Sequence, residues 1–519
     1  MSEEEKLSSY LSKSKLISNS NYEKKIRIAI LGGFTLNGLE ETMRVKCDEK
    51  KIQCTTFVSG YNQYNQEILD EKSQLYKFSP DITFLIIDSR NALGEFFLNP
   101  YSISAEERKR FVEDKSNEII NLAKELVKKS KSKLVISNFS VLSYSPIGIN
   151  EIKEEFGLHD MIRSLNQNIK IGLRLEPEIF IYDLNSFVTK FGENNVFNYK
   201  QFFYGDIRIS LHCIPYLAEE LIGYVTAVLG LSKKCLVLDL DNTLWGGIIG
   251  EDGIEGIKLG DDPVGRSYVE FQHNLLALNQ RGILLAINSK NNFDDAIQVI
   301  NEHPNMVLKQ DNFACVRINW NDKVVNMKEI SDELNIGLDS MVFVDDDPAN
   351  IEYVSSNLPE ISSIHMSAEQ CHNNSRSIRS ISSFFNVLKI TDEDKTRNKM
   401  YLEQRKRSEL KTQAGNLDEF LKQMGISVHI KNADDFTIPR ISQLTLKTNQ
   451  FNLTTRRYQE EDIRKFAQDS EKIVGCAQIQ DKFGDNGITG AYIINKDNEQ
   501  QWTIDTFLLS CRVIGRGIE

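Results

Sequence analysis

The chain has 519 residues, of which 40% are hydrophobic and 26% charged, a composition typical of packed globular proteins and unlike that of disordered or fibrous ones. At roughly 150 residues per domain, this length predicts three to four domains. The 62 basic and 74 acidic residues leave a net charge of −12, which argues against binding nucleic acid or an anionic membrane through the overall field.

The sequence also gives no sign of export or of membrane insertion. No apolar stretch reaches about 18 residues, and the chain opens on Met1-Ser2-Glu3, which is acidic where a signal peptide is basic. The eight cysteines are scattered without a C-x-x-C pair, which favours reduced thiols over disulfides or a zinc site. We therefore expect a soluble, cytoplasmic protein.

The first predicted unit covers residues 26–230, after a polar lead over residues 1–25. Three continuous apolar runs are typical of parallel strands that are covered on both faces: Ile26–Leu31, Ile82–Ile87 and Leu134–Ser137. Helical patterning, including Glu106–Lys129, lies between them. This alternation predicts an α/β unit.

A second α/β unit is predicted over residues 231–388. Its strands are expected at Cys235–Leu238, Ile283–Ile287 and Met341–Val344, and its helices at Ser267–Gln280, Asp294–Asn301 and Lys323–Asn335. A segment dense in charge follows at residues 389–417 and is interpreted as a solvated linking helix.

The third predicted unit covers residues 418–519 and mixes a helix with β-rich stretches. Strands are expected at Ile426–Ile430, Ile473–Gln480, Gly487–Asn495 and Trp502–Arg512. The sequence stops at Glu519, inside what reads as the start of a helix, so we expect a truncated α+β domain.

The strongest functional signal is Asp239-Leu240-Asp241, directly after the predicted strand Cys235–Leu238. Two carboxylates at the carboxyl end of a buried strand are costly to desolvate unless a cation or a substrate compensates them. Phosphoryl transfer uses such a pair, because one carboxylate attacks phosphorus and ligates Mg²⁺ while the other protonates the leaving oxygen.

The other groups that such a site needs follow in order at later strand ends. Ser289 offers a hydroxyl to a phosphate oxygen, and either Lys290 or Lys323 could supply an ammonium group. Asp345-Asp346-Asp347 then offers oxygen ligands for Mg²⁺.

This order of motifs resembles the haloacid dehalogenase (HAD) superfamily of phosphotransferases. The resemblance implies that Asp239 is the nucleophile, Asp241 the general acid and base, Ser289 a phosphate ligand and Lys323 the charge stabiliser. Lys290 fits the lysine motif less well, because it adjoins Ser289. For Mg²⁺ the resemblance implies Asp239, the Asp241 carbonyl, and Asp346 or Asp345.

The flank Leu244-Trp245-Gly246-Gly247 narrows the resemblance to FkbH-like proteins of HAD subfamily IIIC, which load a glyceryl unit from 1,3-bisphosphoglycerate onto an acyl carrier protein. Gly60–Tyr64 and Lys447–Arg457 extend it over nearly the whole chain. The flank's glycines are expected to form a close-turning hairpin, and Trp245 either walls off the site or packs in the core.

One departure concerns the second motif, where such glyceryl transferases often have Cys-Ser-Lys-Asn and this chain has Asn288-Ser289-Lys290-Asn291. Without a thiol at position 288, a glyceryl thioester cannot form there. Cys235 and Cys315 are interpreted as packed core thiols.

The resemblance also extends to the flanking units, of which the first is similar to an SGNH-hydrolase-like, flavodoxin-like domain. Thr35 would replace its usual nucleophilic serine, with Asn138, Asp206 and His212 as further candidates, so a degenerate scaffold or docking surface is favoured over ester hydrolysis. The third unit is similar to a partial N-acetyltransferase (GNAT)-like domain.

In the third unit, Arg512, Gly515 and Gly517 follow a predicted strand and are expected to hold coenzyme A or phosphopantetheine at a helix N-terminus. Lys447–Arg457, which precedes them in the sequence, either supports the resemblance to an acyltransferase-like domain or is a solvated basic face.

The sequence therefore predicts a Mg²⁺-dependent HAD-type phosphatase or glyceryl transferase. Its substrate would be a small phosphorylated acid, and its partner an acyl carrier protein. The alternatives are a plain phosphomonoesterase for a sugar or cell-surface precursor, and a non-enzymatic scaffold that binds a carrier protein.

Overall fold

The computed structural model describes residues 6–17, 22–391, 394, 397, 400–401, 403, 424–498 and 501–519. The chain divides into two compact units, Met1–Val228 and Leu229–Glu519. Most of the predicted linking helix at 389–417 lies outside the described residues. Among the helices that the structure describes, none has the length and apolar character needed to cross a membrane.

The first unit is built on a parallel sheet with the strand order β2-β1-β3-β4-β5. Its strands are β1 (Lys24–Gly32), β2 (Ile52–Val58), β3 (Ile82–Ile86), β4 (Lys133–Ser137) and β5 (Ile179–Tyr182). Every residue of β3 and β4 is buried, as expected for central strands covered on both faces. This order is that of flavodoxin-like sheets, which bind ligands beyond the carboxyl ends of β1 and β3.

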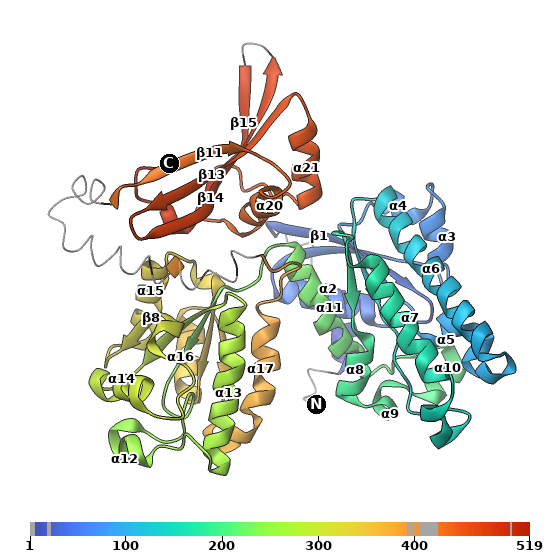
Figure 1. The fold of residues 1–519 in the computed structure, drawn as a ribbon, viewed down its shortest axis with the longest axis horizontal. Helices are drawn as coiled ribbons and strands as arrows, with labels where there is room; N and C mark the ends of the chain where they lie inside the picture. Colours follow the sequence, from blue (N-terminus) through green and yellow to red (C-terminus); the bar gives the residue numbers. More distant parts are fainter. Residues whose placement is uncertain are drawn as a thin grey trace. The chain divides into compact units, whose positions relative to one another are not determined.

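Helices pack in pairs beside this sheet: α2 contacts α11, and α6 contacts α7 (Figure 1). The longer helices of the unit are α1 (Leu7–Leu16), α2 (Leu39–Glu49), α6 (Ala105–Lys129), α7 (Leu158–Leu173), α8 (Leu184–Phe191) and α11 (Ile214–Val228). Short helices are α3 (Tyr64–Leu69), α4 (Gln74–Phe78), α5 (Ser89–Leu93), α9 (Glu193–Val196) and α10 (Tyr199–Gly205). Helix α6 begins at a capping box, in which Ser104 and Glu107 bond each other's backbone amides.

The second unit contains another parallel sheet, with the order β10-β9-β6-β7-β8. Its strands are β6 (Cys235–Leu238), β7 (Leu284–Ser289), β8 (Phe313–Ile318), β9 (Met341–Asp345) and β10 (Ser362–His365). Counted within the unit, this is a Rossmann-like doubly wound order whose first strand, β6, is central. The residues that follow β6 therefore lie at the middle of the end of the sheet formed by the carboxyl ends of its strands.

The helices around this sheet are α12 (Ile249–Gly256), α13 (Pro263–Gln280), α14 (Phe293–Glu302), α15 (Lys323–Leu334), α16 (Pro348–Asn357) and α17 (Asn374–Ser383). Three of them, α13, α15 and α16, begin at aspartates; Asp322 accepts from the backbone amide of Val324, and Asp347 accepts from that of Ala349. A carboxylate at the N-cap stabilises a helix start by about 1 kcal/mol. These caps fix where α15 and α16 begin, beside the carboxyl ends of β7 and β9.

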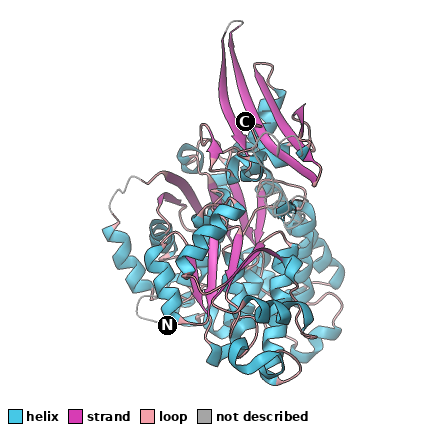
Figure 2. Ribbon diagram, turned by 90° about the vertical axis from the view of Figure 1, so that its left-hand side faces the viewer, coloured by secondary structure: helices cyan, strands magenta, loops and turns pink. Residues whose placement is uncertain are grey.

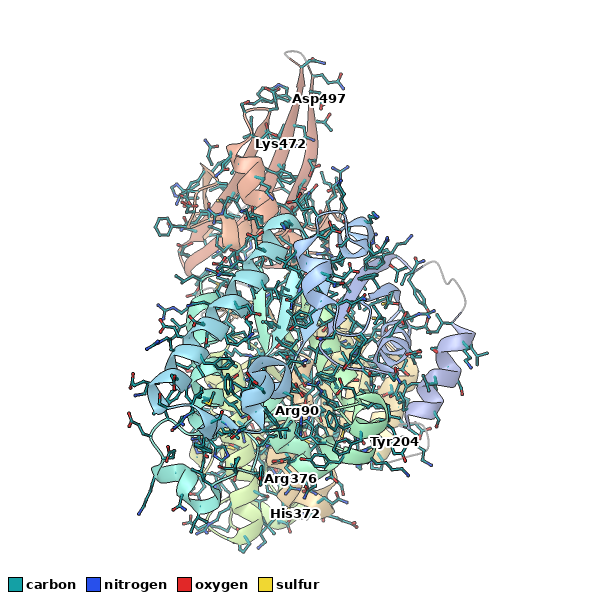
Figure 3. The ribbon with its side chains drawn as sticks, turned by 90° about the vertical axis from the view of Figure 1, so that its right-hand side faces the viewer. Arg90, Tyr204, His372, Arg376, Lys472 and Asp497 are labelled. Carbon is teal, nitrogen blue, oxygen red and sulfur yellow. The ribbon has the colours of Figure 1, made fainter. Side chains whose placement is uncertain are left out.

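The second unit also holds an antiparallel sheet with the order β11-β13-β14-β15-β12 (Figure 2). Its elements are β11 (Ser427–Asn432), α20 (Ile438–Lys447), β12 (Phe451–Asn452), α21 (Glu460–Gln468), β13 (Lys472–Asp481), β14 (Gly484–Asn498) and β15 (Gln501–Leu509). Lys472 and Asp497 lie toward the same end of this sheet (Figure 3). The sheet has its own core, in which Ile441 of α20 packs with Cys476 and Leu508. The protein is thus a multi-unit α/β protein, as the sequence predicts.

The predicted helix after β15 is absent from the structure. Cys511–Val513 forms a single 3-10 turn, and Gly515 and Gly517 follow with φ of 77° and 71°. Left-handed glycines end a helical path rather than extend it. The expected helix N-terminus for a coenzyme A pyrophosphate is therefore not formed here, and the side chain of Arg512 lies outside the described residues.

Candidate active site

The candidate site lies at the carboxyl edge of the second parallel sheet. Asp239 follows β6 directly, Ser289 ends β7 and Asp345 ends β9. The strand registers pair Leu238 with both Ile287 and Val344, so the three strand ends lie in line. Ligands of doubly wound sheets bind at this edge.

Lys323 joins two of these carboxylates. Its Nζ lies 2.6 Å from Asp345 Oδ2 and 3.0 Å from Asp239 Oδ1, and its side chain is only 2% exposed. Lysine at the first position of a helix is opposed by the positive end of the helix dipole. The two carboxylates offset that cost, so the position of Lys323 is explained by the site rather than by the helix.

The charges of the site act on each other. Burial alone would lower the pKa of Lys323, but Asp239 and Asp345 raise it above its ordinary value, so the ammonium keeps its proton. Burial and the charges of Asp239 and Asp345 raise the pKa of Asp346 to about 6. Two carboxylates therefore share one lysine while a third lies beside them, an arrangement that a bound cation would relieve.

Among the described residues, one acidic cluster has the geometry of a metal site. One carboxylate oxygen each of Asp239, Asp345 and Asp346 lies within 4.8 Å of the other two. The buried Oδ1 of Asp239 is ion-paired with Lys323 but lacks an aligned hydrogen bond. An all-oxygen set with such an unsatisfied atom fits Mg²⁺, which prefers carboxylate oxygens and water.

Asp345 and Asp346 differ in their remaining capacity to bind a metal. Besides Lys323, Asp345 accepts from the Asp347 amide at 2.9 Å and from Asn350 Nδ2 at 3.2 Å. Asp345 is fully buried, whereas Asp346 is partly exposed. These contacts favour Asp346 as the ligand and give Asp345 the role of holding Lys323.

Asp241 faces donors that the sequence analysis did not assign. Its Oδ1 accepts from Trp245 Nε1 at 2.9 Å and from the Ile249 amide at 3.2 Å, and its Oδ2 accepts from Asn291 Nδ2 at 2.8 Å. Trp245 is fully buried, so it packs in the core and also orients Asp241. The four-residue spacing from Asp241 to Trp245 was the available signal, but it matches a helical contact as well as this turn.

The residues of the second motif contact different parts of the protein. Ser289 is buried at the strand end, whereas Lys290 is exposed and acts on Asp322 rather than on the carboxylate cluster. Asn288 Nδ2 donates to the Lys323 carbonyl at 3.0 Å, and Asn288 Oδ1 accepts from Asn326 at 3.1 Å. The side chain at 288 therefore binds helix α15, and Lys323 is the lysine that the structure brings to the site.

The glycine flank differs from the expected close-turning hairpin. Gly246 and Lys258 form an antiparallel bridge, with N···O distances of 3.0 and 2.7 Å, and the short helix α12 lies between them. Gly247 has φ of 95°, which a side chain would strain. The flank is thus a closed loop that carries a helical segment.

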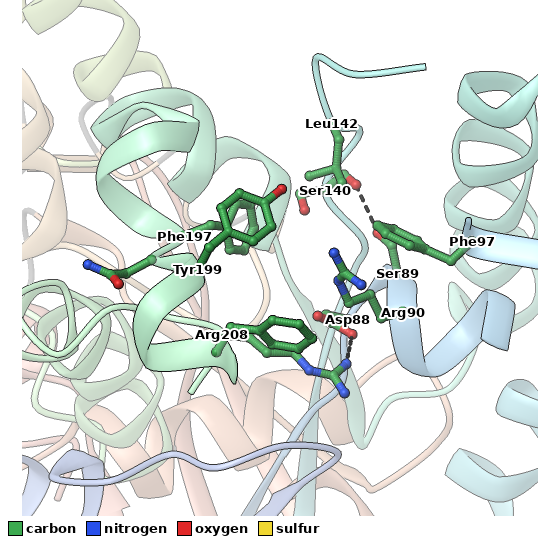
Figure 4. Close-up of a pocket in the computed structure, with 11 residues that line it drawn as sticks. Asp88, Ser89, Arg90, Phe97, Ser140, Leu142, Phe197, Tyr199 and Arg208 are labelled. Atoms are coloured by element: carbon green, nitrogen blue, oxygen red, sulfur yellow. Dashed lines mark hydrogen bonds and ion pairs between the residues drawn. The ribbon is translucent and has the colours of Figure 1, made fainter. Parts of the chain in front are cut away.

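The first unit has a pocket at the carboxyl ends of β3 and β4 (Figure 4). In it Arg208 pairs with Asp88, and the guanidinium of Arg90 lies 4.5 Å from the Phe97 ring centroid and 4.7 Å from that of Phe202. Its walls are mostly aromatic, and its polar groups are two arginines, two serines, Asp88 and Asn198.

The residues of this unit that the sequence suggested for ester hydrolysis form hydrogen bonds with other partners. Asp206 bonds Arg208 at 2.8 Å and Tyr61 at 2.7 Å, while His212 Nδ1 lies 2.7 Å from Ser210 Oγ. Asn138 donates to Asp183 at 2.7 Å. The described residues therefore contain no bonded Asp206–His212 pair, and for Thr35 only its backbone bond to the Asp206 carbonyl is found.

One protein family and one solved structure resemble parts of this chain. Residues 27–226 match the model of the FkbH N-terminal domain. The chain is similar, with 26% identity and a TM-score of 0.67, to the crystal structure of the N-terminal part of protein BF1531 from Bacteroides fragilis, which contains a phosphatase domain complexed with Mg. The match covers 74% of this chain and 99% of that one. No curated protein matches the chain. Residues 27–226 thus resemble an FkbH N-terminal domain, and about three quarters of the chain resembles a protein that contains a Mg-bound phosphatase domain.

Proposed function

We propose that the protein is a Mg²⁺-dependent phosphatase of the HAD type. The observation that carries the proposal is the Lys323 bridge between Asp239 and Asp345, with Asp346 completing an oxygen cluster within 4.8 Å. The likeness to a phosphatase domain that binds Mg supports it. Mg²⁺ would be held by Asp239, the Asp241 carbonyl and Asp346, and would draw charge from the phosphoryl oxygens.

The residues divide the work between attack, proton transfer and charge stabilisation. Asp239 attacks phosphorus and becomes an aspartyl phosphate, while the leaving oxygen takes a proton from Asp241. Oδ2 is the oxygen of Asp241 that suits this transfer, because it has one donor, Asn291, where Oδ1 has two. Water then attacks the aspartyl phosphate as Asp241 takes its proton back. Lys323 and Ser289 bind the phosphoryl oxygens.

The finer proposal is that the substrate is a small phosphorylated acid of the 1,3-bisphosphoglycerate kind and that the acyl acceptor is the thiol of a carrier protein. A thioester on this chain is disfavoured. Cys235 and Cys315 are fully buried, and burial raises the pKa of Cys235. Cys235 also begins β6, at the far end of the strand from Asp239. These positions favour either hydrolysis by the steps above or direct transfer, in which an external thiol loses its proton, its sulfur attacks the acyl carbon, and the carbon–oxygen bond to the phosphate breaks so that phosphate leaves.

A panel of phosphorylated metabolites with Mg²⁺ tests the proposal through phosphate release. We expect turnover on at least one small phosphorylated acid, and none after chelation. Incubation with 1,3-bisphosphoglycerate, with and without a pantetheinylated carrier protein, separates transfer from hydrolysis by mass spectrometry. A glyceryl adduct on Cys235 or Cys315 would overturn direct transfer, and a panel without turnover would overturn the phosphatase.

A further inference from the structure

A second cluster of charged side chains lies in the same unit as the candidate active site. It lies at the end of the parallel sheet where the strands begin, whereas the candidate active site lies where they end. The charged residues that line the basic pocket, as we term it, are five basic residues and one acid: Lys233, Lys234, Arg281, Arg397, Lys447 and Asp394. Lys234 precedes β6 and Arg281 precedes β7, whereas the catalytic groups follow these strands. The four residues of β6 span about 13 Å, so the pocket is separate from the candidate active site.

The single carboxylate is shared by two of the cations. Asp394 pairs with Arg397 and lies 3.2 Å from Lys447 Nζ. Asp394 also accepts from Thr391 at 2.8 Å and from Gln443 at 2.6 Å, so it is fixed in place. Its hydrogen-bonding capacity is largely used by these partners.

Lys234 and Arg281 have carbonyl oxygens as hydrogen-bond partners among the described residues. Lys234 Nζ donates to the Lys447 carbonyl at 3.0 Å, and Arg281 donates to the Phe385 carbonyl at 3.1 Å. Asp339 acts on Lys234 through its charge but forms no ion pair with it in the described structure. Five cations and one carboxylate give the described lining a formal charge of +4.

This surplus of positive charge costs free energy in the unliganded protein. Burial lowers the pKa of Lys234 and of Arg281. Burial and the charge of Arg397 lower the pKa of Lys447 to about 7. Buried like charges that oppose each other are retained where a ligand supplies the missing countercharge.

We propose that the basic pocket is a binding site for a phosphate-bearing small molecule, which goes beyond the proposed phosphatase activity. Guanidinium groups bind phosphate oxygens in a fork and ammonium groups add point charges, and the pocket offers two guanidinium and three ammonium groups. A carboxylate would leave most of the surplus charge uncompensated, whereas a diphosphate group offsets most of it.

Binding of inorganic diphosphate to the full chain tests the proposal. Titration calorimetry and thermal unfolding are run with EDTA at constant ionic strength, with inorganic phosphate in parallel. We expect saturable binding of diphosphate and a rise in the unfolding temperature. Lys447→Gln should weaken binding at least tenfold, whereas Lys328→Gln, the same change at an exposed lysine of α15, should not alter it.

Other variants keep the result decisive. Should Lys447→Gln fail to fold, Arg281→Gln takes its place with the same expectation. Lys323→Gln must retain the affinity, because that lysine lies in the catalytic cluster. Absence of saturable binding, equal binding by Lys447→Gln and Lys328→Gln, or loss in Lys323→Gln alone would overturn the proposal. Binding of phosphate but not diphosphate would also overturn the diphosphate match.

Discussion

At the scale of single residues, Lys323 organises the candidate site. Its ammonium bridges Asp239 and Asp345, and its backbone carbonyl accepts from Asn288. Asp322, one residue before it, caps the helix and so fixes the start of α15. The residue is thus held from three directions, which suits a group that must meet a phosphoryl oxygen without rearrangement.

Asp239→Asn should abolish phosphate release while leaving the fold intact. We also expect a higher free energy of unfolding without metal, because the change removes one of three clustered carboxylates that repel one another. Steady-state assays and urea unfolding measure the two effects. Asp332→Asn, the same change at an exposed position of α15, is the control. Turnover within about tenfold of the unmodified protein would contradict the nucleophile assignment.

Asn288→Cys should not create a thioester site. The side chain at 288 is fully buried and bonds α15, and its loss leaves the Lys323 carbonyl without this donor. An unsatisfied buried group of this kind costs about 1–3 kcal/mol, so we expect reduced stability in urea unfolding. Mass spectrometry after incubation with an acyl phosphate should find position 288 unmodified, and an adduct there would refute the orientation argument.

The sequence predicted much of the site at this scale, because strand ends identify their residues. Asp239, Ser289 and Asp345 each follow or end an apolar run, and parallel strands bring such ends together. Asn291 and the contact of Trp245 with Asp241 were not predicted. Both depend on how a loop turns, and a loop's path leaves no periodic pattern in the sequence.

At the scale of elements, whether the sequence predicted a strand of the parallel sheets depends on the place of that strand in its sheet. In the two parallel sheets, the predicted strands correspond to β1, β3 and β4 in the first and to β6, β7 and β9 in the second, which are the interior strands. The unpredicted β2, β5, β8 and β10 are the four sheet edges. An edge strand is partly exposed and mixes polar with apolar residues, as in Ser362–His365, so it lacks the continuous apolar run.

Gly282→Ala should destabilise the entry into β7. Gly282 has φ of 98°, and a Cβ there would lie 1.7 Å from the Asp394 carbonyl oxygen. Strain and displacement together should cost about 1–3 kcal/mol in the free energy of unfolding. Gly250→Ala is the control, because Gly250 lies in α12 with nothing within 4 Å of the added atom. Equal stability of the two variants would show that residue 394 does not approach Gly282 in solution.

At the scale of the whole molecule, the two compact units have separate hydrophobic cores. Leu165 belongs to the core of the first unit, and Leu275 belongs to that of the second. Separate cores allow separate unfolding, so a free energy of unfolding refers to one unit, and for the variants above that is the second unit.

Mg²⁺ should therefore stabilise one unit alone. In calorimetry we expect two unfolding transitions. Mg²⁺ should raise the unfolding temperature of the second unit alone, and should stabilise that unit by about 2.7 kcal/mol at a hundredfold excess over Kd. Leu165→Ala, a buried truncation costing about 2–5 kcal/mol, identifies the first unit's transition. Asp346→Asn should abolish the Mg²⁺ effect. A Mg²⁺ shift that persists in Asp346→Asn would place the metal elsewhere.

The hydrogen bond between Trp245 and Asp241 has an optical consequence. Of the three tryptophans, Trp245 is fully buried, whereas Trp320 and Trp502 are 76% and 57% exposed. Iodide in solution quenches exposed indoles by collision and does not reach buried ones. The fluorescence that survives iodide therefore comes from Trp245, and its yield changes when the charge accepting its N–H changes. The chain thus carries a natural fluorophore that reports on the surroundings of Asp241 without any added label.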